Sequence, residues 1–110
     1  MKNNIDKNVI LSGIEYLKNT KKVIFDPYPN YDKEVFDILS SLGEDFDYQN
    51  RYHEIEKKDI NNMNLDDLRT IYTFYRRGER FSDGFISQYI EDGSLLKLAL
   101  RELELLEDDI

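Results

Sequence analysis

The 110-residue chain contains no cysteine, and it has only one histidine, two prolines and five glycines. Without cysteine it can form no disulfide, no thiolate metal site and no thiol nucleophile. The single histidine, His53, has no second histidine or HExxH-type spacing to complete a metal site or a catalytic pair. We therefore expect no catalytic residue, no metal and no cofactor, and we interpret His53 as a partly exposed residue without a catalytic role.

Long apolar runs and excess positive charge are missing as well. No window approaches the ~18 apolar residues of a membrane span, and the N-terminal MKNNIDKNVILSG lacks the pattern of a signal peptide. We expect a cytoplasmic protein with no membrane partner. The 15 basic and 23 acidic residues give a net charge of −8. Because such a charge repels phosphate groups, direct nucleic-acid binding is disfavoured.

Length and composition predict one α-helical domain covering residues 1–110. Hydrophobic residues make up 40% of the chain, which is enough for a core despite 35% charged residues. The length is well below that at which cores divide. Strand-like alternation is not sustained, and the β-branched pair Val23 and Ile24 is too short to found a sheet. We predict an all-α fold, with about five short helices packed as a single compact orthogonal bundle.

Apolar periodicity and capping residues place the helices. The first predicted helix runs from Asp6 to Asn19, and "FDPYPNY" forms a loop after it, because proline holds the preceding residue out of the helical region. The other predicted boundaries are a cap at Asn30 or Asp32 with an end at Gly43, a short helix capped by Asp47, a cap at Asn64 with an end at Gly78, a start at Ser82 or Asp83 with a stop at Gly93, and a last helix capped by Ser94.

The last helix has more leucine than one face can hold. One predicted face contains Leu95, Leu96, Ala99, Leu100, Leu103 and Leu106. Leu98 and Leu105 point nearly the opposite way and have no obvious place in the core. An exposed second apolar stripe is usually covered by a partner or a second copy. We therefore name Leu98 and Leu105 as a candidate interface, for a homodimer or for a protein partner.

Basic residues are concentrated in the segment "YRRGERFSDG", residues 75–84. Guanidinium groups bind oxyanions, and a helix start near Ser82 to Gly84 would offer free N–H groups, so the segment could bind an anion or a phosphate. The alternative is an internal brace in which Arg80 pairs with an acid such as Asp83, Glu91 or Asp47. The brace is favoured because acids outnumber bases. The candidate residues for either role are Arg76, Arg77, Arg80, Phe81, Asp83 and Gly84.

Acids and tyrosines are the two other abundant candidates. The acids match no metal-binding loop, so we interpret them as a solvated face; they are Asp45, Asp47, Asp66, Asp67, Glu102, Glu104, Glu107, Asp108 and Asp109. Tyrosine suits both the edge of a small core and a partner-binding surface, and the core interpretation is favoured. The tyrosines are Tyr16, Tyr28, Tyr31, Tyr48, Tyr52, Tyr72, Tyr75 and Tyr89.

The segment from Leu65 to Leu103 resembles the C-terminal half of a small bacterial and phage domain family of unknown function, family 6508. Its landmarks are an arginine, then Arg-Phe, an acid and glycine, and a second glycine before a leucine-rich helix; they look like Arg76 or Arg77, Arg80, Phe81, Asp83, Gly84 and Gly93. Upstream, "YPNYDKEVFDILSSLGEDFDY" is also similar, with Tyr48 where the family usually has tryptophan. The resemblance implies a fold and transfers no chemistry.

Three functions are compatible with these features. The favoured one is a small cytoplasmic protein–protein interaction module from a bacterium, phage or mobile element, which acts without catalysis. The second is an acidic DNA mimic that inhibits a nucleic-acid-binding enzyme, although its acids are interleaved with basic residues. The third is a small anion-ligand binder that acts through Arg76, Arg77 and Arg80.

Overall fold

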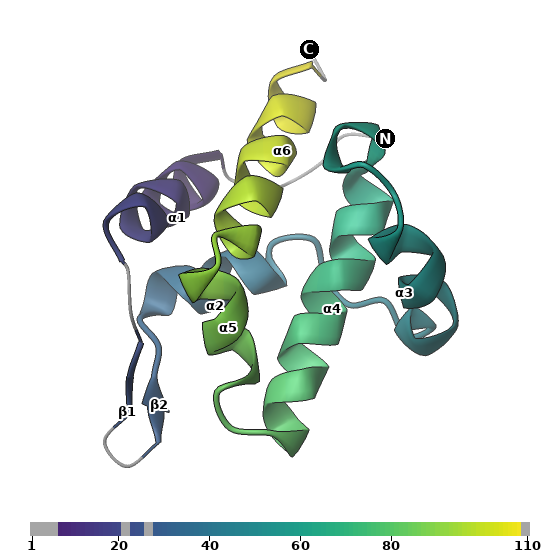
Figure 1. Ribbon diagram of the computed structural model, residues 1–110. Coiled ribbons are helices and arrows are strands. Elements are labelled where there is room, and N and C mark those ends of the chain that lie inside the picture. Colours follow the sequence, from purple (N-terminus) through teal and green to yellow (C-terminus); the bar gives the residue numbers. More distant parts are fainter. Residues whose placement is uncertain (1–6, 21–22, 26–27, 109–110) are drawn as a thin grey trace.

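The computed structural model describes residues 7–20, 23–25 and 28–108, and it is predominantly helical (Figure 1). The predicted all-α class is confirmed, although the described residues form six α-helices and one 3₁₀ turn where about five helices were expected. The elements are α1 Lys7–Asn19, β1 Ile24–Phe25, β2 Pro29–Asn30, α2 Lys33–Ser40, α3 Tyr48–Glu56, η1 Ile60–Asn62, α4 Leu65–Phe81, α5 Phe85–Glu91 and α6 Ser94–Asp108.

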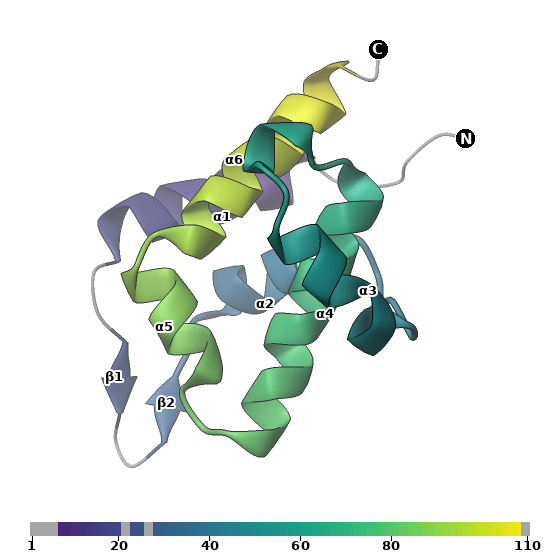
Figure 2. The ribbon, with the colours of Figure 1, turned by 45° about the vertical axis from the view of Figure 1, so that its right-hand side comes forward.

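The long helix α4 is central to the packing. It contacts α2, α3, α5 and α6, while α1 packs on α2 and α6. Figures 1 and 2 show α1 and α3 on opposite sides of the molecule with α4 and α6 between them. Fully buried side chains from these helices form the core, among them Ile10, Ile38, Leu68, Tyr72 and Leu95. No helix in the described part of the chain is long and apolar enough to cross a lipid bilayer.

Helix α4 begins as its sequence predicts. The Asn64 side chain accepts a hydrogen bond from the Asp67 N–H at 2.8 Å, and the Asp67 carboxylate accepts one from the Asn64 N–H at 3.1 Å. Lys58 pairs with the same carboxylate at 2.9 Å. This reciprocal cap satisfies two N–H groups that a helix start leaves without partners. The start of α4 is therefore fixed locally.

A short hairpin, which strand patterning did not predict, joins α1 to α2. Ile24 pairs with Asn30 and Phe25 with Pro29 in an antiparallel ladder. The hairpin lies beside α5 in both ribbon views, and the Val23 N–H donates to the Glu91 carboxylate at 3.0 Å. Three residues of the sequence predictions lie outside the described residues: Pro27 of the predicted loop, Asp6 at the start of the first predicted helix, and Asp109 among the acids.

The junction of α4 and α5 differs from the prediction. Gly78 does not end α4, which continues to Phe81, and α5 is preceded by Gly84 and not by a capping Ser82 or Asp83. Gly84 has φ of 90°, a conformation that glycine adopts without strain. At Gly78 the space that a Cβ would take is filled by the Phe85 ring. Gly78 is thus a packing residue that lets α5 approach α4.

The buried face of α6 also differs from the prediction. Leu98 was expected outside the core, but it is only 4% exposed, whereas Leu100 is exposed. Leu105 is half-buried against the core. The buried stripe contains Leu95, Leu98, Ala99, Glu102 and Leu106. Because Glu102 interrupts this stripe in the sequence, the apolar pattern alone pointed to a face rotated away from the true one.

Gly78→Ala tests the close approach of α5 to α4. We expect the free energy of unfolding to fall by about 1 to 2 kcal/mol, because the Phe85 ring must move to accept the new methyl group. In a Phe85→Ala background the same change should be neutral or stabilising, since alanine favours a helix by about 1 kcal/mol over glycine. Urea unfolding of the four proteins measures this coupling. Equal effects of Gly78→Ala in both backgrounds would contradict it.

Candidate functional site

Arg76 and Arg77 bind the acidic loop that joins α2 to α3. Arg77 forms an ion pair with Glu44, and Arg76 lies 3.7 Å from the other oxygen of the same carboxylate. Arg76 also donates to the Gly43 carbonyl at 3.0 Å. Both arginines are partly buried. These contacts agree with the brace interpretation for Arg76 and Arg77, with Glu44 as a partner that the sequence did not single out.

Asp45 is the buried centre of the same loop. Its carboxylate accepts from the Thr70 hydroxyl at 2.6 Å, from Arg51 at 2.9 Å and from the Asp47 N–H at 2.9 Å. The Asp45 N–H donates to Thr73 at 3.0 Å. Burial would raise the pKa of Asp45, but these hydrogen bonds and then the charge of Arg51 outweigh burial and lower it. The loop is thus fastened to the middle of α4.

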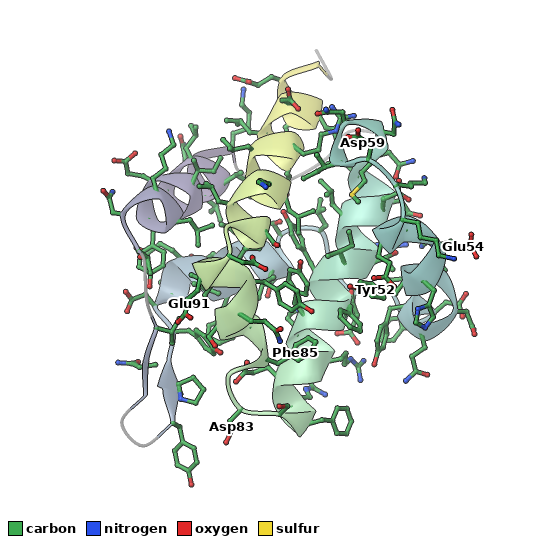
Figure 3. The ribbon with its side chains drawn as sticks, viewed as in Figure 1. Tyr52, Glu54, Asp59, Asp83, Phe85 and Glu91 are labelled. Atoms are coloured by element: carbon green, nitrogen blue, oxygen red, sulfur yellow. The ribbon has the colours of Figure 1, made fainter. Side chains whose placement is uncertain are left out.

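Arg80 was expected to be the main brace, and this expectation is wrong. Its side chain is exposed, and no hydrogen bond or ion pair connects it to the rest of the described chain. Arg80 does lie close enough to Arg76 that, after burial, its charge helps to lower the pKa of Arg76. Phe81 is 87% exposed, and Asp83 lies at the exposed turn between α4 and α5 (Figure 3).

The N–H groups at the start of α5 already have partners within the protein. The Glu79 carboxylate accepts from the N–H groups of Gly84 and Ile86, each at 2.9 Å, and from the Tyr31 hydroxyl at 2.8 Å. The Ser87 N–H donates to that Tyr31 hydroxyl at 3.2 Å. Burial, and then Glu79, raise the pKa of Tyr31. An external anion at this helix start would have to displace Glu79.

A cleft lined by aromatic rings lies between α3, α4, α5 and α6. Tyr75 stacks on Tyr89 with ring centroids 4.1 Å apart, and Tyr52 stacks on Phe74 at 3.7 Å. Phe85 contacts both stacks edge-on, through Phe74 and Tyr89. Figure 3 shows Tyr52 between α3 and α4 and Phe85 between α5 and α4. The cleft has a volume of about 270 Å³, and we call it the tyrosine cleft.

The remaining tyrosines and His53 are spread over the molecule. Tyr72 is fully buried and Tyr28 is exposed, so tyrosine serves both the core and the surface. The imidazole of His53 is exposed, and its Nδ1 lies 3.3 Å from the Glu56 carboxylate. In the described part of the chain, no group of three or more His, Asp or Glu side chains is placed to hold a metal ion.

Glu102, Asp45 and Asp67 were interpreted from the sequence as part of a solvated face. This interpretation is wrong for these three acids, because all of them are buried. The carboxyl group of Glu102 lies 2.9 Å from the Tyr72 hydroxyl and 2.8 Å from the Ser41 hydroxyl. Burial raises the pKa of Glu102 to about 7, although these hydrogen bonds oppose the rise. Ser41 also lies 2.7 Å from the Ile38 carbonyl. The Ser41 hydroxyl has one proton and can donate it to only one of these two oxygens. If it donates to the Ile38 carbonyl, a protonated Glu102 can donate to the Ser41 oxygen, and every group in the network then has a partner.

Asp45→Ala tests the loop attachment, and Arg80→Ala, on the helix α4 to which the loop is attached, is the control. We expect Asp45→Ala to lower the free energy of unfolding by about 3 kcal/mol, because Arg51, Thr70 and the Asp47 N–H lose their buried acceptor. Arg80→Ala should change it by less than about 0.5 kcal/mol. Since the pKa of Asp45 is lowered, the part of this stabilisation that depends on the ionised carboxylate should be present at neutral pH and should be lost as the pH falls through the folded-state pKa. Equal stability of the two variants would contradict this assignment.

Glu102→Gln tests the buried carboxyl group. Its folded-state pKa of about 7 exceeds the ordinary value of 4.5, so wild-type stability should fall as the pH rises between these values. The variant should match wild type near pH 4 and be about 3 kcal/mol more stable near pH 8. Urea unfolding across this pH range measures the difference. A pH-independent difference would refute the raised pKa.

Comparison with known proteins identifies the family. The model of a family of unknown function, DUF6508, matches residues 6–108, which is nearly the whole chain. No curated protein matches the sequence, and no solved structure matches the chain. The resemblance seen in the C-terminal half of the sequence is thus confirmed, while the correspondence of individual motif residues stays a prediction. The chain belongs to the DUF6508 family of unknown function.

Proposed function

We propose that this protein is a protein–protein interaction module that binds its partner through Phe46 and Phe81. These two phenylalanines are each 87% exposed, and this is the observation that carries the proposal. Isolated exposed apolar residues are common on protein surfaces. Phe46 and Phe81 differ from that background because they project from two elements that are fastened to each other.

The base beneath the two rings is held by several contacts. Phe46 directly follows Asp45, whose N–H donates to Thr73 of α4. Phe81 lies one helical turn after Arg77, which pairs with Glu44 of the same loop, so it continues the helix face that the loop covers. From Thr73 to Phe81 the helix rises about 12 Å, well within one interface of standard size. Phenylalanine and arginine are both enriched in such interfaces.

A fixed base reduces the entropy lost on binding. Side chains that are already ordered before association lose less freedom when a partner binds. The partly buried Arg76 and Arg77 and the buried Asp45 hold the backbone beneath both rings. The exposed Arg80, beside Phe81, adds a positive charge to the same surface. We call the surface formed by Phe46, Arg77, Arg80 and Phe81 the phenylalanine face.

The two other candidate functions have less support. A DNA mimic needs a continuous band of free carboxylates, whereas Asp45, Asp67 and Glu102 are buried and Glu44 is paired with arginine. An anion-ligand binder would have to displace Glu44 from Arg77 and Glu79 from the start of α5. The cytoplasmic location and the phage or mobile-element origin stay predictions. Homodimerisation through Leu98 and Leu105 was proposed because both were expected to be exposed, and that argument no longer holds, since Leu98 is in the core.

The double variant Phe46→Ser/Phe81→Ser tests the phenylalanine face. Both rings are almost fully exposed, so we expect the free energy of unfolding to change by less than about 0.5 kcal/mol. Proteins retained from an extract of the native host by the immobilised wild-type chain should be lost with the double variant. Replacing aromatic interface residues typically removes 2 kcal/mol or more of binding energy, which is roughly a thirtyfold loss of affinity.

Tyr28→Ser is the matched control, because Tyr28 is also an exposed aromatic residue but lies in the hairpin. It should retain the same proteins as wild type. Retention that the double variant leaves intact would contradict the proposed face. If the wild-type chain itself retains no protein from the extract, that result would contradict the proposed function.

A further inference from the structure

Three hydroxyl groups in the tyrosine cleft find no hydrogen-bond partner among the residues that the structure describes. They belong to Tyr52, Tyr75 and Tyr89, and none of them donates to or accepts from another group in the described part of the chain. Two other tyrosine hydroxyls are paired, that of Tyr72 with Glu102 and that of Tyr31 with Glu79. Tyr75 is buried, whereas Tyr52 and Tyr89 are half-buried. Buried tyrosine hydroxyls usually find a partner, so the Tyr75 hydroxyl, with two others lining the same cleft, indicates a place for a polar ligand.

Tyr75 gives the strongest indication. Its side chain is only 4% exposed, and its hydroxyl is nevertheless unpaired. Among the described side chains, the fully buried polar atoms without a partner are the Nε atoms of Arg69, Arg76 and Arg77. The Tyr75 oxygen is not one of them, so it keeps contact with the space of the cleft. The stack on Tyr89 fixes the ring that carries it.

The floor of the cleft is apolar. Met63, Ile71 and Leu98 line it, and each is at least nine-tenths buried. A volume of about 270 Å³ lies just below the range of pockets for drug-sized molecules. The cleft therefore has room for one side chain or a small molecule with an apolar stem. The stem would lie on the floor, with its polar end at the hydroxyl groups.

The electrostatic surroundings of the hydroxyl groups are negative. Burial, then Tyr89 and Glu56, raise the pKa of Tyr52 to about 12, and burial, then Asp92 and Glu56, raise the pKa of Tyr89. Lys97 also lines the cleft, but its side chain is exposed, and no cation lowers the pKa of any of the three tyrosines. The net charge of −8 adds to the same field. A cationic polar end is therefore favoured over an anionic one.

We propose that the tyrosine cleft binds a guanidinium group on an apolar stem, either a free alkylguanidine or the arginine side chain of a partner protein. A guanidinium has five N–H donors in one plane, and the three phenol oxygens and the Glu56 carboxylate that line the cleft are acceptors for them. Its flat cation also packs favourably against aromatic rings. An arginine side chain, like an alkylguanidine, has an aliphatic stem that ends in a guanidinium group. This site is separate from the phenylalanine face.

The experiment is a titration of the full chain with n-butylguanidinium, followed by ¹H–¹⁵N NMR at constant ionic strength. We expect saturable shifts centred on the amides of Tyr75, Tyr89 and Leu98. n-Butanol has the same stem without charge and should give no saturable shifts. A blocked Gly-Arg-Gly peptide distinguishes the source of the ligand. Equal or tighter peptide binding assigns the cleft to a partner's arginine, and weaker binding assigns it to a free guanidine, both within the proposal.

Two variants and one control make the test specific. Tyr75→Phe keeps the stacked ring and should weaken n-butylguanidinium binding roughly fivefold. Glu56→Gln should weaken it about tenfold, since it removes the charged acceptor. Tyr28→Phe, outside the cleft, should leave it unchanged. Because the Tyr75 hydroxyl has no internal partner, Tyr75→Phe should melt no lower than wild type.

Several outcomes would overturn the proposal. Equal binding of n-butanol and n-butylguanidinium would make the cleft a purely apolar site. Shifts confined to residues 44–46 would place the cation on the acidic loop instead. Unchanged affinity in Tyr75→Phe, or a lower melting temperature of that variant, would show that the hydroxyl serves the fold and not a ligand. The absence of saturable shifts would also exclude the site.

Discussion

The attachment of the Glu44–Asp45 loop to the middle of α4 is the contact on which the other features depend. Asp45 is buried against Thr70 and Arg51, and Glu44 pairs with Arg76 and Arg77. A buried carboxylate is stable only when its oxygens are hydrogen-bonded and its charge is compensated. Several donors meet that need at once. In consequence α2, α3 and α4 hold fixed relative positions, and Phe46 and Phe81 project from one rigid surface.

The junction of α4 and α5 is the second constraint, and here a carboxylate replaces the expected arginine. Glu79 accepts from the first N–H groups of α5, and the Tyr31 hydroxyl links the same group to the segment before α2. Gly78 allows the Phe85 ring to lie against α4. The close approach brings Tyr89 onto Tyr75 and so forms the wall of the tyrosine cleft. The site is thus a product of helix packing.

Sequence reasoning found the helices more reliably than the candidate sites. The Asn64 cap and the placement of Gly43 after the end of α2 depend on local chemistry, and they occur as predicted. The roles predicted for Gly78, Leu98 and Arg80 were wrong. Each role depends on whether another segment of the folded chain packs against the residue, and local sequence does not show this. Glu44, Glu79 and Glu102 were missed as buried or bound groups. In a chain with 23 acids, the sequence does not indicate which carboxylates are internal.

The all-α class, most helix boundaries and membership of the DUF6508 family follow from the amino-acid sequence. Helix formation and capping depend on residues within a few positions of each other, so they can be read from local spacing. The folded chain shows which carboxylate meets which arginine, and which tyrosine hydroxyls find no partner among the described residues. Those outcomes depend on burial and on contacts between distant segments, and local sequence does not encode either one by itself.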